Sequence, residues 1–142
     1  MAFAFKRPDT AFADTRRAKE VEEIRNPLHL KWIASLPAVI SGAMGCEAAH
    51  INFPDKRFGK HMRGKGTKVG DNWTLPLLPE EHRTGPAAQH KTGKEKDWWE
   101  SHGIDANTLA DRLWRVSGDT AAAIVIINQS LASAGRLPSR DL

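Results

Sequence analysis

Apolar residues recur at helical spacing in the C-terminal part of the chain. The spacing along this part of the chain predicts one apolar face of a helix, formed by Leu109, Leu113 and Val116. Asp105 lies at the N-cap position, where its side chain would accept a hydrogen bond from a free backbone amide. Glycines follow the apolar segments at positions where helices commonly end. The pattern predicts flanking helices within about residues 95–135, spanning 97–102, 106–116 and 120–134.

Two apolar segments in the middle of the chain have the length of strands rather than helices. The first covers residues 46–53 and is ended by Pro54, and the second covers residues 72–78. Residues 54–70, which join them, are rich in glycine and lysine and almost without large apolar side chains. We therefore expect two short strands connected by a long loop.

The segment after the second strand predicts a helix. Residues 79–83 begin with a proline followed by two acids, which is typical of a first helical turn. A Thr-Gly-Pro sequence at 84–86 interrupts the pattern, and residues 87–91 can resume the helix. The order of strand, strand and helix predicts a small α+β core over about residues 46–91.

The N-terminal part of the chain carries weaker signals. Residues 1–14 alternate phenylalanine, alanine and charge, and we expect them to form a flexible basic arm. Good helix formers predict a helix from residue 14 or 15 to about residue 25, where Asn-Pro stops it. Residues 28–40 fit either a short helix or an extended segment. Because 142 residues are too few for two well-packed domains, we expect one domain over residues 15–142.

The balance of charged residues gives a weak indication of the partners of the protein. The chain has 21 Lys and Arg against 17 Asp and Glu, a formal charge of +4 and a pI of about 9.5, which favours polyanionic partners. No apolar run reaches membrane-spanning length, and the N-terminal residues lack the order of a signal peptide. We therefore expect a soluble, cytoplasmic protein with no membrane partner.

Cys46 is the only cysteine in the chain. A single thiol excludes an intramolecular disulfide framework and fits a reducing cytoplasm. It also excludes a zinc site built from four cysteines or from two cysteines and two histidines. A metal ion in this chain would be held mainly by histidine, carboxylate or water.

Five of the six histidines lie between residues 50 and 102, and the order of three of them along the chain suggests a shared site. His50 lies in the first predicted strand, Asn72 opens the second, and His82 and His90 follow on the predicted helix. Phosphodiester hydrolysis needs a base to take a proton from water and a cation to stabilise the developing charge. A hairpin followed by a helix can supply both, because neutral imidazole is a competent ligand for divalent transition metals.

Four strings around these positions resemble the HNH endonucleases of phages and prophages, including the recombination enhancement function nucleases. They are Cys-Glu-Ala-Ala-His-Ile at 46–51, Gly-Lys-Gly-Thr-Lys-Val-Gly-Asp-Asn-Trp-Thr-Leu-Pro-Leu at 64–77, Glu-His-Arg-Thr-Gly-Pro-Ala-Ala-Gln-His at 81–90 and Trp-Trp-Glu-Ser-His-Gly-Ile-Asp at 98–105. The resemblance covers roughly residues 28–116. It implies an α+β fold with a small ββα-metal (HNH, His-Me finger) core and flanking helices.

The resemblance also implies a function, which is metal-dependent hydrolysis of DNA phosphodiester bonds in the cytoplasm of a bacterial host. Mg²⁺ or Mn²⁺ is the implied working ion, and Zn²⁺ is an ion that imidazoles could also bind. DNA is the implied partner. A recombinase filament is a further candidate partner, because the nearest relatives work with one.

Carried over residue by residue, the resemblance makes His50 the general base that activates water. Asn72 would orient His50, and His82 and His90 would bind the metal ion. HNH sites usually place a further ligand just before the base, where this chain has Ala49. The ion would therefore rest on two imidazoles, with water and phosphate oxygens completing its shell.

The position of the orienting residue stays open in the sequence. The interval from Asn72 to His82 is one residue longer than in the commonest HNH pattern, so Asp71 or Trp73 could take the place of the asparagine. Independently of the resemblance, Asp-Asn before a strand is also ordinary turn chemistry.

A run of thirteen residues in the connecting loop contains six cations and no acid. These cations either belong to an ordinary solvated loop or contact phosphates, where each releases counterions and adds affinity without sequence preference. Their position beside His50 favours DNA contact. The cations are Lys56, Arg57, Lys60, Arg63, Lys65 and Lys68.

Two other functions fit the same residues. The missing ligand at Ala49 suits a DNA-binding protein that keeps the fold but is catalytically impaired, whereas the presence of His50 and His82 argues for an enzyme. A hydrolase acting on another phosphate ester is the third interpretation, and RNA substrates would reveal it.

Overall fold

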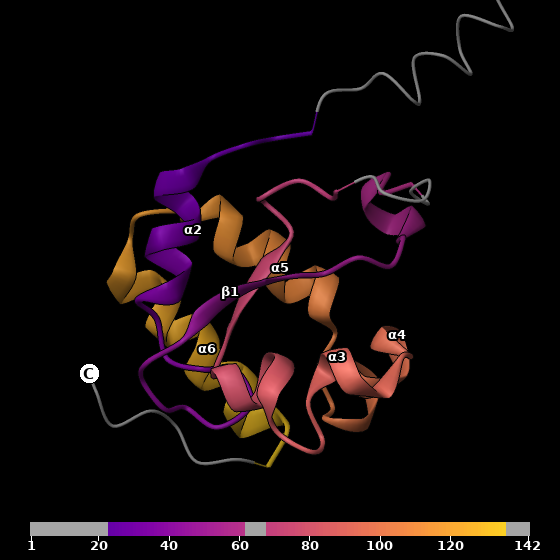
Figure 1. Cartoon of the computed structure of the whole chain (residues 1–142). Coiled ribbons are helices and arrows are strands. Elements are labelled where there is room, and N and C mark those ends of the chain that lie inside the picture. The colour runs from indigo at the N-terminus through magenta and orange to yellow at the C-terminus, as the bar shows by residue number, and fades with distance from the viewer. Residues whose placement is uncertain (1–22, 62–67, 136–142) are drawn as a thin grey trace, which may run out of the picture.

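The computed structural model describes residues 23–61 and 68–135. Within them the protein is an α+β structure, with a two-stranded antiparallel sheet surrounded by helices (Figure 1). The strands are β1 (Glu47–His50) and β2 (Thr74–Leu77). The α-helices are α2 (Pro27–Ala34), α3 (Gln89–Thr92), α4 (Glu95–Ser101), α5 (Ala106–Arg115) and α6 (Thr120–Ser133), and two further helical turns are the 3₁₀ turn η1 (Lys56–Phe58) and the π-helical turn η2 (Glu80–Thr84).

The two strands pair with Glu47 opposite Leu77 and His50 opposite Thr74. Every residue of β2 is buried, because α2 packs along both strands and α5 also contacts β2 (Figure 1). Pro76 lacks an amide proton, but its carbonyl accepts a bond of 3.1 Å from the segment after α2. The sheet therefore places His50 at the end of a strand whose partner is held inside the protein.

One continuous apolar core joins the sheet to the helices that follow it. Leu75 enters it from β2, Leu109 and Leu113 from α5, and Ile127 from α6. Trp99 of α4 is fully buried in the same cluster. Two strands of four residues are marginal by themselves, so it is this packing that keeps them paired.

The expected strands and flanking helices are confirmed, with shifted ends. Each strand is shorter than expected, and α4 begins two residues earlier. The ambiguous segment 28–40 begins with the helix α2. The arm over residues 1–14 and most of the helix expected to residue 25 lie outside the described residues, and residues 23–25 are not helical. None of the helices in the described part of the chain is long and apolar enough to span a membrane.

The helix expected after β2 forms in two pieces, η2 and α3. The first piece is a π-helical turn that ends at Gly85, whose amide donates to the Glu80 carbonyl at 3.0 Å. A Cβ atom at Gly85 would lie 2.5 Å from that carbonyl oxygen, so the close approach requires glycine. The break brings His82 of η2 and His90 of α3 together, with ring centroids 4.2 Å apart.

Candidate functional site

His50, His82 and His90 line one cavity of about 270 Å³. His50 comes from the end of β1, His82 from η2 and His90 from α3, so the cavity lies where the sheet meets the helical segments that follow it. Three of the four residues predicted to carry chemistry are therefore brought together. The other lining residues are Asn52, Lys68 and Val69.

A hydrogen bond to Glu47 sets the tautomer of His82. The His82 Nδ1 lies 2.7 Å from Glu47 Oε1, and Arg83 donates to both oxygens of the same carboxylate. The bonds from Arg83, aided by His82, hold the pKa of Glu47 below its ordinary value against the opposing effect of burial. An ionised carboxylate can only accept, so Nδ1 of His82 carries the proton and Nε2 keeps its lone pair.

His82 and His90 form a pair of imidazoles suited to a divalent ion. Burial lowers the pKa of His82 and outweighs the opposite effect of Glu47, so this ring is neutral near pH 7, the form that binds metal. No group of three or more His, Cys, Asp or Glu side chains within residues 23–61 and 68–135 is arranged to hold an ion. The donor set fits an ion held by two imidazoles, with oxygen ligands from water or substrate.

Asp71 holds His50 in a fixed orientation. Its Oδ1 lies 2.9 Å from His50 Nε2, and its Oδ2 accepts a bond of 2.8 Å from the Asn26 amide. Burial alone would raise the pKa of Asp71, but these two bonds and the charges of His50 and Arg25 hold it below its ordinary value. The ionised carboxylate keeps a proton on Nε2 of His50, which leaves Nδ1 as the basic nitrogen.

The orienting role predicted for Asn72 is corrected to Asp71. Residues 70–73 form a tight turn, closed by a bond of 3.0 Å between its last amide and its first carbonyl. This turn directs the Asp71 side chain to His50, whereas the side-chain oxygen of Asn72 lies against Gly70. The sequence left Asp71 open as an alternative, and the geometry of the turn selects it.

The predicted DNA contact of Lys60 is also corrected, because only 4% of this residue is exposed. Its Nζ donates to the Ile51 carbonyl and to the side-chain oxygen of Asn107, each at 2.6 Å, and lies 4.7 Å from the centre of the Trp73 ring. An ammonium group enclosed in this way cannot reach a phosphate.

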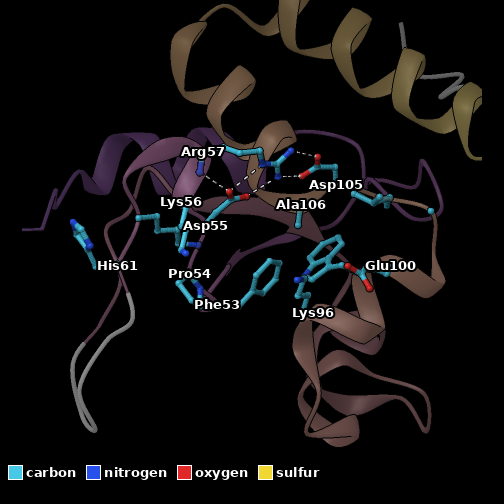
Figure 2. Close-up of a pocket in the computed structure, with 14 residues that line it drawn as sticks. Phe53, Pro54, Asp55, Lys56, Arg57, His61, Lys96, Glu100, Asp105 and Ala106 are labelled. Atoms are coloured by element: carbon cyan, nitrogen blue, oxygen red, sulfur yellow. Dashed lines mark hydrogen bonds and ion pairs between the residues drawn. The ribbon is translucent and has the colours of Figure 1, made fainter.

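A second cleft, of about 870 Å³, lies between the loop after β1 and helices α4 and α5 (Figure 2). Figure 2 shows Arg57 bridging Asp55 and Asp105 there, with bonds of 2.6 to 3.0 Å to all four carboxylate oxygens. The bonds from Arg57 lower the pKa of Asp55 to about 2. Arg57 therefore ties the loop to α5, while Lys56 and Lys96 line the same cleft as exposed cations.

The remaining cations of the basic run fall into two groups. Lys68 is exposed and lines the cavity that contains His50. Arg63 and Lys65 belong to residues 62–67, which lie outside the described part of the chain.

Glu47 is a residue of the candidate site that sequence reasoning missed. It lies three residues before His50, in a strand whose next two residues are alanines. An acid in a short, otherwise apolar strand was the available signal. The sequence could not show that its partner would be His82, which is 35 residues away along the chain.

No protein-family model matches this chain, and no curated protein or solved structure matches it either.

Replacing Asp71 with asparagine should lower the stability of the fold at neutral pH. The folded pKa of Asp71 is lowered, so its ionisation stabilises the fold above the ordinary pKa of about 3.9 and ceases to do so as the pH falls through the folded value. We expect Asp71→Asn to lose about 1.5–3 kcal/mol of unfolding free energy at pH 7. The variant should also show a flatter pH dependence below about pH 4.

Urea unfolding at a series of pH values measures both effects. Asp97→Asn is the control, because Asp97 is exposed on α4 and its loss should cost only the small interaction of a surface charge with the helix dipole. Wild-type and Asp71→Asn curves that run parallel down to about pH 3 would contradict an ionised Asp71 in the folded protein.

Proposed function

We propose that this protein is a metal-dependent DNA endonuclease with an HNH-type ββα-metal core. The observation that carries the proposal is the single cavity shared by His50, His82 and His90, in which His50 and His82 are each bonded to a different carboxylate. The order of β1, β2 and η2 supports the ββα arrangement. Phosphodiester hydrolysis is a reaction that needs a base and a bound cation in one place.

His50 would act as the general base. Its Nε2 is committed to Asp71 at 2.9 Å, so Nδ1 is the nitrogen that would take a proton from the attacking water. The positive charge that this transfer leaves on the ring would be stabilised by the Asp71 carboxylate. The same bond keeps the ring in one orientation and one tautomer.

His82 and His90 would hold the divalent ion. Bound there, the ion would stabilise the negative charge that develops on the phosphate. Mg²⁺ or Mn²⁺ is our proposed working ion, and Zn²⁺ is a further ion that the imidazoles could bind. Ala49, where many HNH sites carry a ligand, is fully buried in β1, so the ion would take its other ligands from water and substrate rather than from a third side chain among the described residues.

Exposed lysines beside the two cavities would contact the DNA backbone. Lys68 lies at the His50 cavity, and Lys56 and Lys96 lie at the larger cleft. Neither Lys56 nor Lys96 forms an ion pair with another residue of the described part of the chain. Each can therefore neutralise a phosphate without giving up an existing partner.

Supercoiled plasmid DNA with Mg²⁺ or Mn²⁺ tests the proposed function. We expect nicked or linear product with the metal ion, and intact plasmid when a chelator is added. DNA coated with a recombinase filament serves as a second substrate, because the family resemblance implies such a partner. Intact DNA on both substrates, with either metal, would contradict the nuclease.

A catalytically impaired DNA-binding protein on the same fold is the second candidate function. It is favoured by the two-imidazole donor set, which lacks a third protein ligand within the described residues. Such a protein would bind duplex DNA at low salt with a chelator present and would leave it intact with every metal ion. The plasmid assay and a gel-shift assay together separate the two candidates.

Removal of the two cleft lysines should reduce the salt dependence of DNA binding. The Lys56→Ala, Lys96→Ala double variant loses two phosphate contacts, so the slope of log K against log salt should become shallower by about 1.8 for duplex DNA. Fluorescence anisotropy with a chelator present measures this slope. Lys31→Ala is the control, because Lys31 is exposed on α2 away from both cavities. Equal slopes for the wild type and the double variant would remove the cleft from the DNA interface.

A further inference from the structure

The peptide unit that joins Ile51 to Asn52 is held at both ends by charged side chains. Its carbonyl oxygen accepts a bond of 2.6 Å from Lys60 Nζ, and its amide donates to both carboxylate oxygens of Glu95, each at 3.1 Å. A peptide dipole is negative at the oxygen and positive at the amide, so each charge meets the end of opposite sign. We call Lys60, Glu95 and this peptide unit the peptide clamp.

The fold buries the charge of Lys60 and partly buries that of Glu95. The Lys60 ammonium also donates to Asn107 and lies over the Trp73 ring, which compensates its burial. Glu95 begins helix α4, and burial raises its pKa even though the Asn52 amide and the charge of Lys60 act in the opposite direction. Charges removed from water are tolerated only when other groups compensate them. Both charged groups contact the Ile51–Asn52 peptide, so this peptide is the backbone unit whose position they fix.

The peptide clamp lies where the pairing of the two strands stops. The ladder of β1 and β2 ends at His50, and one more bond, of 2.8 Å, joins the Ile51 amide to the Trp73 carbonyl. The next peptide unit is the clamped one. Its Asn52 lines the same cavity as His50, and the Asn52 side-chain amide lies 3.5 Å from the His50 carbonyl. The clamp therefore takes the place of a strand partner on the backbone that follows His50.

We propose that Lys60 and Glu95 are positioning residues for His50. By fixing the Ile51–Asn52 peptide they fix the backbone that leaves His50 and the wall of the cavity in which His50 acts. The kinetic consequence of this inference rests on the proposed nuclease function. Its structural consequence, a single environment for the His50 ring, is independent of catalysis.

Glu95→Ala, compared with Asp97→Ala, tests the peptide clamp in the full chain. Both acids lie in the first turn of α4, so each variant removes a similar interaction with the helix dipole, but only Glu95 contacts the clamped peptide. We expect Glu95→Ala to lower kcat for plasmid nicking about 10- to 100-fold, the effect of losing a charge-assisted hydrogen bond. Duplex DNA affinity in chelator should stay unchanged, and the ring ¹⁵N resonances of His50 should shift. Asp97→Ala should match the wild type in all three measurements.

Glu95→Gln keeps the size of the side chain and one acceptor oxygen, so it should recover part of kcat, and it replaces Glu95→Ala if that variant does not fold. Wild-type kcat and His50 resonances in the Glu95 variant would overturn the inference and leave the proposed function standing. If the wild type does not cleave DNA, the proposed function fails, and the His50 resonances alone then test the peptide clamp. A shift in the Glu95 variant but not in Asp97→Ala would support the clamp, and unshifted resonances in both would overturn it.

Discussion

The His50→Ala variant should nick supercoiled plasmid about 10²- to 10⁴-fold more slowly than the wild type, which is the usual contribution of a general base. The variant has no imidazole to accept the proton from water, while His82, His90 and the surface lysines remain. Its affinity for duplex DNA in chelator should therefore be unchanged. Initial nicking rates and fluorescence anisotropy measure these two quantities.

His102→Ala is the matched control for this loss. His102 follows helix α4 and packs against Trp98, with ring centroids 4.4 Å apart, rather than lining the cavity. Free imidazole added to His50→Ala should restore part of the nicking rate, because it can replace the missing proton acceptor. Equal rates for the wild type and His50→Ala would remove His50 from the mechanism.

Loss of either proposed metal ligand should weaken Mn²⁺ binding by more than about 100-fold. Removing an outer hydrogen-bond partner of a ligand costs roughly 10- to 100-fold in metal affinity, and removing the ligand itself should cost more. We therefore expect a graded series in which His82→Ala and His90→Ala bind weakest. Glu47→Ala, which removes the partner of His82 and of Arg83 but no proposed ligand, should be intermediate. Isothermal titration calorimetry with Mn²⁺ measures the series.

His102→Ala again serves as the control and should bind Mn²⁺ as the wild type does. Nicking by His82→Ala and His90→Ala should recover in part at high Mn²⁺ concentration, because mass action can refill a weakened site. Wild-type Mn²⁺ affinity in both variants would contradict the two-imidazole site and show that the ion binds elsewhere.

The fold class followed from signals that are local in the sequence. The apolar face of α5 is set by Leu109 and Leu113 at helical spacing, and its start is set by Asp105, which accepts a bond of 3.3 Å from an amide within the first turn. The break at Gly85 was visible in the same way, because glycine and proline interrupt helices wherever they occur. Such features depend on residues a few positions apart, and their physical causes act over the same range.

The residues around the histidines were predicted less well. The order of His50, His82 and His90 indicated a shared site, and all three line one cavity. The residue that orients His50 was assigned to Asn72, whereas the geometry of one tight turn gives the contact to Asp71. A shift of one residue in a turn redirects a side chain completely, and no periodic pattern records that direction.

Lys60 shows most clearly which kind of feature the sequence does not predict. In the sequence it is one cation among six in a basic loop, and composition favours a solvent-exposed position for it. Tertiary packing instead encloses it between Ile51, Trp73 and Asn107. Burial of a charge depends on whether distant polar groups converge to compensate it, which only the folded chain decides.

The sequence by itself determined the kinds of element, their order and the histidines that could carry chemistry, because propensity, periodicity and capping are properties of neighbouring residues. Only the tertiary structure decided which charges those histidines meet. The partners of His50 and His82 lie 21 and 35 residues away along the chain. Hydrogen bonds form only within about 3 Å, so such partners are fixed by how the turns and helices pack and not by spacing in the sequence.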